Sequence, residues 1–196
     1  MVRAEGIFLR PPSMTDYPAW AELRAGSRDH LTRWEPEWTR DELSRSAFRR
    51  RVRFYQRELR DDMGYAFFLF REPGMREPGF RESGETLIGG LTISNVRRGV
   101  TQAAALGYWL GRPHSGRGHM TAAVRAITGF AFDELKLHRL EAACLPDNRA
   151  SIGVLERSGF VREGIARRYL KINGRWQDHL LFALLGDDPR PAEGRG

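Results

Sequence analysis

Cysteine and long apolar runs are what the sequence most clearly lacks. Among 196 residues there is one cysteine, Cys144, which excludes an internal disulfide framework and a four-cysteine zinc site. No stretch of about 18 consecutive apolar residues occurs, so no helix is expected to cross a membrane. The N-terminal residues also lack the apolar segment of a secretory signal. We therefore expect a cytoplasmic protein.

Lysine is also scarce, because all but two of the 32 basic residues are arginine. The formal net charge is +7 and the isoelectric point is about 10.3. Guanidinium groups bind phosphate through paired hydrogen bonds, so this composition favours an anionic partner such as CoA, a nucleotide or RNA. A bias toward arginine codons explains it equally well. The segment from Arg40 to Arg60 contains eight arginines. These arginines form either a solvated helix face or a surface that contacts ribosomal RNA.

The periodicity of apolar residues predicts a mixed α/β chain. Asn173 and Gly174 predict a tight hairpin turn, since both residues accept positive φ. Residues 5–185 are expected to form one domain followed by a disordered tail over 186–196, and the Pro- and Gly-rich stretch 71–85 is expected to form a turn without chemistry. The predicted helices cover residues 15–26, 40–60, 121–136 and 149–158, and the predicted strands cover 6–10, 65–70, 86–96, 103–110, 139–145, 160–165, 169–172 and 176–185.

A glycine-rich loop stands between the strand predicted at 103–110 and the helix predicted at 121–136. Gly116 and Gly118 let the backbone approach a phosphate, and the start of the helix leaves N–H groups unpaired in a favourable dipole. The loop therefore predicts an anion site, although a tight turn with solvated arginines explains the same residues. It is neither a Walker loop nor a dinucleotide fingerprint, because no Gly-Lys-Ser/Thr follows and the Gly-x-Gly-x-x-Gly pattern is not completed.

A second motif begins the helix predicted at 149–158. Asn148 and Ser151 are three residues apart, so both side chains can face one side of the helix start. Asn148 is at the same time a good N-cap. The nearby Cys144 has no histidine paired with it in the sequence pattern, so we expect a small buried residue rather than a nucleophile.

Together these motifs resemble those of the GNAT acetyltransferases. The matching strings are Ser-Gly-Arg-Gly-His-Met at 115–120, Asn-x-x-Ser at 148–151 and Glu-Arg-Ser-Gly-Phe at 156–160. Trp-Glu-Pro at 34–36 and Tyr-Leu-Lys-Ile-Asn-Gly-Arg-Trp-Gln-Asp-His at 169–179 resemble the RimJ/RimL branch, and RimJ more than RimL. The resemblance implies an α/β fold with a mixed, mostly antiparallel central sheet flanked by helices. A splayed strand pair would form the acyl-CoA cleft.

The resemblance also implies acetyl-CoA as cosubstrate, no metal, and three segments that bind CoA. The loop should hold the pyrophosphate through backbone N–H groups, the end of the 103–110 strand should run beside the pantetheine arm, and Asn148 should bond that arm. Ser115 stands where the family usually has Gln or Arg, and Met120 where it has Gly or Ala. The implied CoA-binding residues are Tyr108, Trp109, Leu110, Ser115, Gly116, Arg117, Gly118, His119, Met120, Thr121, Asn148 and Ser151.

The acid and the base are less clearly marked. Many GNAT enzymes carry a tyrosine acid in the helix after the Asn, but Leu155 occupies that neighbourhood, so Ser151 is the candidate proton donor. Glu35, beside Trp34 and Trp38, is the first candidate for binding the substrate ammonium or accepting its proton, with a plain surface acid as the alternative. Glu141 and His138 are further candidates for the base, while Asp178 and His179 are expected to make structural hydrogen bonds first and substrate contacts second.

The implied reaction is direct attack of an amine on the thioester in a ternary complex. The favoured acceptor is the N-terminal alanine of a ribosomal protein. One alternative is a small amine such as a polyamine, an amino sugar or an antibiotic. The other is a weakly catalytic CoA- or RNA-binding factor in ribosome assembly.

Overall fold

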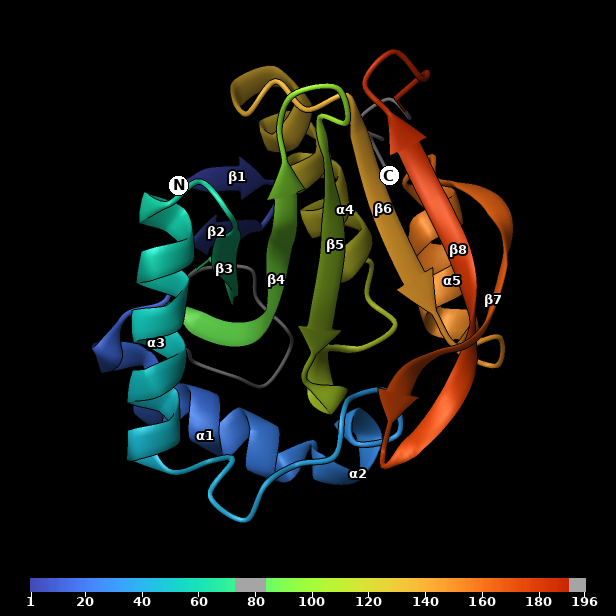
Figure 1. Ribbon diagram of the computed structural model, residues 1–196. Coiled ribbons are helices and arrows are strands. Elements are labelled where there is room, and N and C mark those ends of the chain that lie inside the picture. The colour runs from blue at the N-terminus through green and yellow to red at the C-terminus, as the bar shows by residue number, and fades with distance from the viewer. Residues whose placement is uncertain (73–83, 191–196) are drawn as a thin grey trace.

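The computed structural model describes residues 1–72 and 84–190. They form an eight-stranded sheet with helices against it (Figure 1). The centre of the turn predicted at 71–85 and the end of the predicted tail, 191–196, lie outside the described residues. The first part of that tail is hydrogen-bonded to the sheet end, since Gly186 N donates to His138 O at 2.8 Å.

The sheet has the strand order β1-β2-β3-β4-β5-β6-β8-β7. Neighbouring strands are antiparallel except β5 and β6, which run parallel. This confirms the mixed, mostly antiparallel sheet that the resemblance implies. The strands are β1 Val2–Ala4, β2 Ile7–Arg10, β3 Tyr65–Arg71, β4 Thr86–Arg97, β5 Ala103–Leu110, β6 Arg139–Cys144, β7 Val161–Ile172 and β8 Arg175–Leu185.

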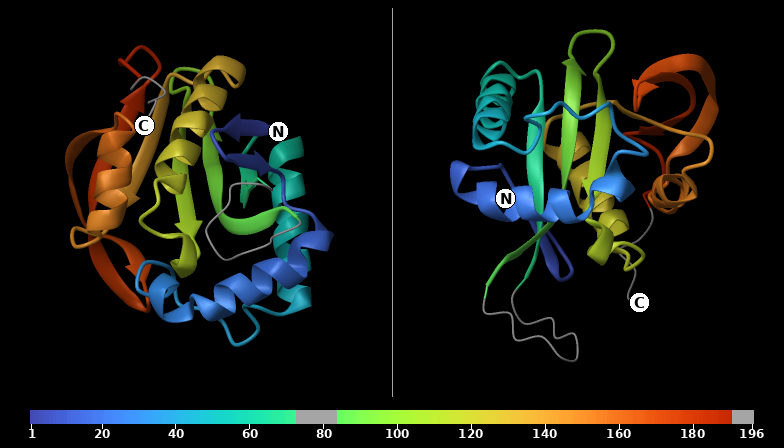
Figure 2. Two further views of the ribbon diagram at one scale, coloured as in Figure 1. Left: turned by 180° about the vertical axis from the view of Figure 1, so that it is seen from behind. Right: turned by 90° about the horizontal axis from the view of Figure 1, so that it is seen from below.

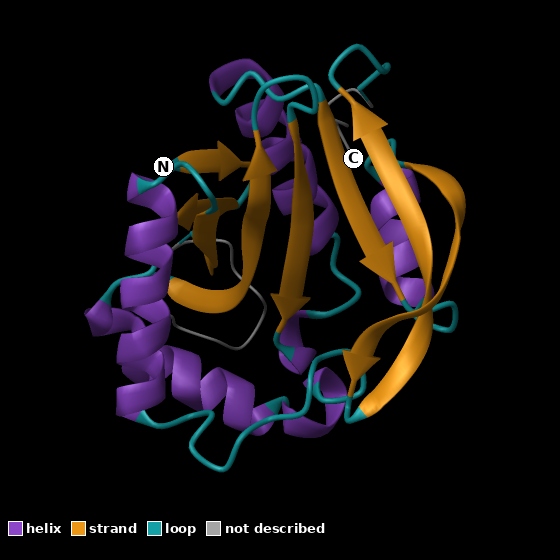
Figure 3. Ribbon diagram, viewed as in Figure 1, coloured by secondary structure: helices purple, strands orange, loops and turns teal. Residues whose placement is uncertain are grey.

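The parallel pair β5 and β6 splays apart. Pairing is limited to Ala103–Ala105 of β5 and Arg139–Glu141 of β6. Beyond these residues β5 stays paired with β4, and β6 stays paired with β8, so the two strands diverge toward their C-terminal ends (Figure 3). The predicted splayed strand pair is confirmed.

Helices pack on both faces of the sheet (Figure 2). In Figure 1, α4 His119–Gly129 and α5 Arg149–Arg157 lie behind it, and α3 Arg45–Arg60 lies in front of β3 and β4. Helices α1 Tyr17–Gly26 and α2 Arg28–Leu31 run across the lower end of the strands. Within the described residues, no helix has both the length and the apolar character needed to cross a bilayer.

Two apolar clusters hold these layers together. The larger one joins the back of the sheet to α4 and α5 and includes Val124, Ile127 and Leu155. The smaller one lies in front and places Trp20 of α1 against Phe48 of α3, with ring centroids 4.7 Å apart. Each fully buried side chain of this size stabilises the fold by about 2–3 kcal/mol. The clusters therefore fix both helical layers on the sheet that carries the cleft.

Several element boundaries differ from the predictions for local reasons. The helix predicted from residue 40 begins at Arg45, because Ser44 caps it and its Oγ accepts a hydrogen bond from Ala47 N at 3.1 Å. The helix predicted over 121–136 begins earlier, and its α-helical part ends at Gly129, after which Phe130–Glu134 form a π-helical turn. The two strands predicted over 160–172 are one strand, β7, interrupted by a bulge between Ala166 and Leu170. The predicted turn at Asn173 and Gly174 is confirmed, with φ of 44° and 77°.

Candidate active site

A cavity of about 890 Å³ opens where β5 and β6 separate. It reaches from the loop before α4, on one side of the sheet, to the 30–36 segment and the end of β7 on the other side. The cavity therefore has lining residues on both sides of the sheet, and a reaction between two substrates needs a site that holds both. Its lining includes Trp34, Glu35, Tyr108, Gly116, Gly118, Asn148, Ser151 and His179.

The glycine loop forms one wall of this cavity and shapes the start of α4. Gly116 and Gly118 have φ of 78° and 81°, and Gly118 is the N-cap. The first bond inside the helix runs from Ala122 N to Gly118 O at 3.0 Å, so the preceding N–H groups, from His119 to Thr121, have no acceptor in the helix. A methyl group added at either glycine would meet no atom within 4 Å, so the space beside the two glycines is open. The wall fits a diphosphate.

The predicted loop residues line the cavity together, with the exception of Arg117, which the structure does not place on its wall. His119 does lie on the wall. Burial lowers the pKa of His119, and the positive charges of Arg71 and Arg117 lower it further. The imidazole is therefore neutral near pH 7, and the positive potential at this wall comes from the N–H dipoles at the start of α4.

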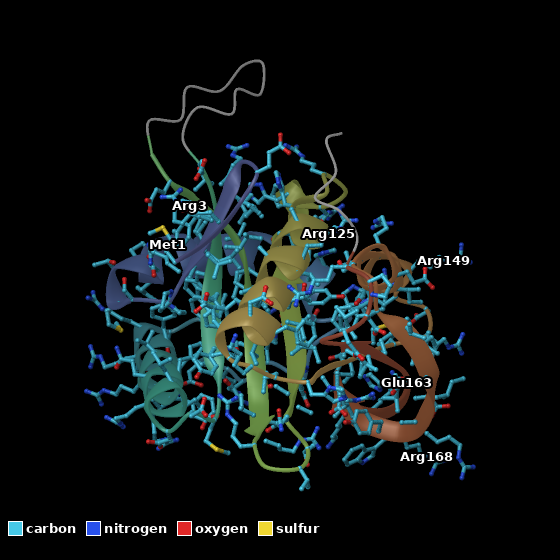
Figure 4. The ribbon with its side chains drawn as sticks, turned by 90° about the horizontal axis from the view of Figure 1, so that it is seen from above. Met1, Arg3, Arg125, Arg149, Glu163 and Arg168 are labelled. Carbon is cyan, nitrogen blue, oxygen red and sulfur yellow. The ribbon has the colours of Figure 1, made fainter. Side chains whose placement is uncertain are left out.

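Ser151 lies on the opposite wall and contacts β5 through Tyr108. The Tyr108 hydroxyl and Ser151 Oγ are 2.7 Å apart. Asn148 caps α5, since its Oδ1 accepts a hydrogen bond from Ser151 N at 3.1 Å, and its amide NH₂ group is not used by the cap. The helix α5 is itself tied to α4, because Arg125 of α4 donates to Arg157 O at 2.7 Å (Figure 4).

Tyr108 has a role in this wall that sequence reasoning missed. We expected it only beside the pantetheine arm, and its hydroxyl hydrogen-bonds to Ser151. Burial raises the pKa of Tyr108 far above its usual value, so the hydroxyl keeps its proton. No sequence signal indicates this contact, because the two residues are 43 positions apart.

Glu35 lies on the other side of the cavity, and both of its carboxylate oxygens already accept hydrogen bonds. Arg24 donates to Oε1 at 3.1 Å and to Oε2 at 2.5 Å, and Trp38 Nε1 donates to Oε2 at 2.8 Å. Arg24 is only 3% exposed and its guanidinium lies 4.9 Å from the ring of Trp109. Glu35 therefore balances a buried positive charge and holds the 33–38 segment over the cavity.

The two other candidates for the base lie away from the cavity wall. Glu141 accepts hydrogen bonds from Arg97 at 2.6 Å and Arg139 at 3.0 Å, and neither Glu141 nor His138 lines the cavity. Arg139 also pairs with Glu163 of β7, whose position is marked in Figure 4. These carboxylates belong to an ion-pair network at the other end of β6.

Cys144 and His179 line the cavity, whereas Asp178 does not. Burial raises the pKa of the Cys144 thiol, so it stays protonated, in line with the small buried residue we expected. Asp178 has a structural role, because its Oδ1 accepts a hydrogen bond from Arg168 N at 2.8 Å within the β7 bulge. In the parts of the chain described, 1–72 and 84–190, no cluster of three His, Cys, Asp or Glu side chains is arranged to hold a metal ion.

A sheet splayed at a parallel strand pair, with a glycine-rich helix start on the wall of the resulting cavity, defines a protein that binds an acyl-CoA. The comparisons agree. The family model described as "Acetyltransferase (GNAT) domain" matches residues 7–161. The chain therefore belongs to the GNAT acetyltransferase family, and acetyl-CoA is the cosubstrate.

Similar proteins align with this sequence over nearly its whole length. "Probable N-acetyltransferase YjcK" of Bacillus subtilis is 38% identical over 188 residues, which are 96% of this chain and 98% of that protein. The "[Ribosomal protein uS5]-alanine N-acetyltransferase" of Escherichia coli is 33% identical, over 90% of this chain and 87% of its own length. Among solved structures, Mycobacterium smegmatis RimJ in complex with CoA-disulfide has a TM-score of 0.81 and 32% identity, with 94% of this chain and 85% of that chain covered.

Proposed function

We propose that this enzyme acetylates the α-amine of a protein N-terminus, and that the acceptor is the N-terminal alanine of a ribosomal protein. The observation that carries the proposal is the cavity that joins the glycine loop to the opposite side of the sheet, where a peptide end can reach the thioester. The name of the Escherichia coli relative, a ribosomal-protein alanine N-acetyltransferase, supports this acceptor. Residues 5–185 form the domain in this proposal.

In this proposal the cosubstrate lies along three segments. Residues 115–121 bind the pyrophosphate of acetyl-CoA through the unpaired N–H groups at the start of α4. The end of β5, residues 108–110, runs beside the pantetheine arm, where β5 has no partner strand on the β6 side. The free amide group of Asn148 donates to the same arm.

The acceptor amine attacks the thioester carbonyl directly. Holding both substrates in one cavity lowers the barrier by several kcal/mol, and a main-chain N–H of residues 108–110 donates to the developing oxyanion, which contributes about 3 kcal/mol. Ser151 returns a proton to the CoA sulfur, and Tyr108 keeps the Ser151 hydroxyl in place and protonated. This pair takes the role of the tyrosine that α5 lacks.

We propose that Glu35 acts on the acceptor by charge. Oε2 accepts hydrogen bonds from both Arg24 and Trp38, whereas Oε1 accepts one from Arg24 and keeps a further lone pair. A carboxylate at the cavity wall attracts the ammonium form of the amine and orients it. Because both of its oxygens already accept hydrogen bonds, we assign Glu35 to orienting the acceptor rather than to removing its proton.

The arginine-rich α3 provides a surface for ribosomal RNA in the same proposal. Asp41 pairs with Arg50 and Glu42 with Arg51, while Arg49 and Arg53 make no ion pair with the described residues. Binding through such residues weakens steeply with salt. A filter-binding assay with 16S RNA, repeated across salt concentrations, tests this surface. A flat salt response contradicts it.

The function is tested by acetyl transfer to a set of amines. The acceptors are a peptide starting with alanine, the same peptide with a blocked N-terminus, spermidine and an aminoglycoside. The proposal expects turnover of the free alanine peptide alone. Mass spectrometry of ribosomal proteins, from cells with and without the gene, then identifies the acceptor as the protein that loses one acetyl group. Turnover of spermidine or the aminoglycoside with none of the peptide contradicts the proposal.

A further inference from the structure

A buried histidine, His179 of β8, faces the acceptor side of the cavity. It is 2% exposed and lines the cavity wall. Its neighbours in the strand, Leu180 and Phe182, enter the apolar cluster shared with α4 and α5. Since Leu180 follows His179 directly and side chains alternate along a strand, His179 points to the face opposite these helices. The glycine loop opens into α4, so His179 and the CoA-binding loop lie on different sides of the sheet.

The hydrogen bonding of His179 determines which ring nitrogen is basic. Nδ1 lies 3.0 Å from Gln177 O, and a carbonyl oxygen can only accept, so Nδ1 carries the proton. Nε2 of the neutral ring then holds a lone pair, and it has no hydrogen-bond partner among the described residues. The ring of Tyr169 lies against the imidazole, with centroids 5.9 Å apart and planes at 71°. The ring is thus held on two sides, with its basic nitrogen unused.

Other titratable groups on the cavity wall are less suited to take a proton from an amine. Both Glu35 oxygens accept strong hydrogen bonds. His119 lies in the CoA-binding loop. His30 belongs to α2, and burial together with Arg112 and Arg33 lowers its pKa, which makes it a weaker base. The remaining titratable or charged groups that line the cavity are Tyr108, Cys144, Arg157 and Lys171.

We infer that His179 Nε2 is the base that takes the proton from the acceptor ammonium. The inference rests on the proposed function. The ammonium gives one proton to Nε2, and the neutral amine forms the C–N bond at the thioester carbonyl. The C–S bond breaks, the sulfur keeps its electron pair, and the second nitrogen proton ends on the CoA sulfur through Ser151. His179 then releases its proton to water. The products are the acetylated amine, CoA thiol and one free proton.

The matched variants are His179→Gln and His138→Gln, since His138 is exposed and away from the cavity. Glutamine can still donate a hydrogen bond to Gln177 O but cannot take up a proton. At about pH 7, where an α-amine with a pKa of about 8 is mostly protonated, kcat of H179Q falls roughly 10²-fold or more. At about pH 9.5, where the amine is already neutral, the loss shrinks to a few-fold. H138Q follows the wild type at both pH values.

The inference is overturned if H179Q matches H138Q at neutral pH, or if its loss is equal at both pH values, as a structural role predicts. The comparison uses whichever amine the wild type acetylates, so failure of the alanine peptide alone contradicts the proposed acceptor and not the base. Should H179Q fail to bind acetyl-CoA, ¹⁵N NMR of the wild-type histidines decides instead. The expected result is an Nδ1–H tautomer for His179, with an Nε2 signal that shifts on adding a CoA–peptide bisubstrate. An Nε2–H tautomer, or no shift, overturns the inference.

Discussion

Replacing Gly118 by alanine tests whether the loop before α4 binds the CoA pyrophosphate. Gly118 has a φ of 81°, and an alanine in this region costs roughly 1–2 kcal/mol of folding free energy. Because an added methyl group meets no atom within 4 Å, backbone strain is the whole cost. For a chain of this size, we expect the melting temperature to fall by roughly 2–8 °C.

The same substitution should weaken acetyl-CoA binding by more than the lost stability explains. The methyl group enters the open space beside Gly118, at the helix start where the proposal places a phosphate. The loss of one hydrogen bond to a charged group costs about 1.5–3 kcal/mol, which raises Kd roughly 10- to 100-fold. Isothermal titration calorimetry measures this at a temperature where the variant is fully folded.

Gly26→Ala provides the matched control. Gly26 is the last residue of α1, and a methyl group there also meets no atom within 4 Å. Its φ is not positive, so G26A should leave both the melting temperature and Kd close to wild type. If G118A lowers the melting temperature yet binds acetyl-CoA as tightly as G26A does, the pyrophosphate does not lie at this helix start and the proposed binding mode is wrong.

Three further predictions concern the walls of the cavity. Arg24→Met leaves the Glu35 carboxylate without its partner, so we expect a loss of about 3–5 kcal/mol in urea unfolding, and R24M combined with Glu35→Gln should recover part of it. Tyr108→Phe removes the hydroxyl that fixes Ser151, so kcat should fall about 10-fold with acetyl-CoA affinity unchanged, and Ser151→Ala added to Y108F should cost little more, because the two hydroxyls act as one pair. The pKa of His119 is lower in the folded protein than in the unfolded chain, so the unfolded chain binds more protons below about pH 6.5 and the stability decreases as the pH is lowered through this range. His119→Gln should make the melting temperature depend less on pH there, and an unchanged pH dependence contradicts the assignment.

Much of the fold could be predicted because the signals are local. The turn at Asn173 and Gly174, the β5 strand and the glycine loop each depend on a few adjacent residues. The predicted start of α3 was wrong by five residues, because the arginines from residue 40 onward are compatible with a helix as well as with a turn. The N-cap at Ser44 determines where the helix begins. The bulge that joins the two halves of β7 depends on pairing with β8, which periodicity does not show.

The site was predictable only where it follows a motif. Short motifs place Gly116, Gly118, Asn148 and Ser151 at helix starts, and these four residues line the same cavity. The contact of the Tyr108 hydroxyl with Ser151 and the ion pair between Arg24 and Glu35 could not be predicted. Each contact joins elements that are distant in the sequence, and tyrosine or arginine at such positions is common on protein surfaces. A long-range contact gives no periodic signal, so its chemistry is visible only in the folded chain.

The buried Arg24–Glu35 ion pair holds the 33–38 segment beside the cavity. Desolvating a guanidinium is costly unless a carboxylate and aromatic faces surround it, and here Glu35, Trp38 and Trp109 do so. The pair fixes the 33–38 segment, whose Glu35 O also accepts a hydrogen bond from Asn173 N at 3.0 Å. That bond ties the segment to the β7–β8 hairpin, which carries His179. A substitution in the hairpin turn at Asn173 and Gly174 should therefore change the KM for the acceptor. The affinity for acetyl-CoA should stay the same, because the loop before α4 lies on the other side of the sheet.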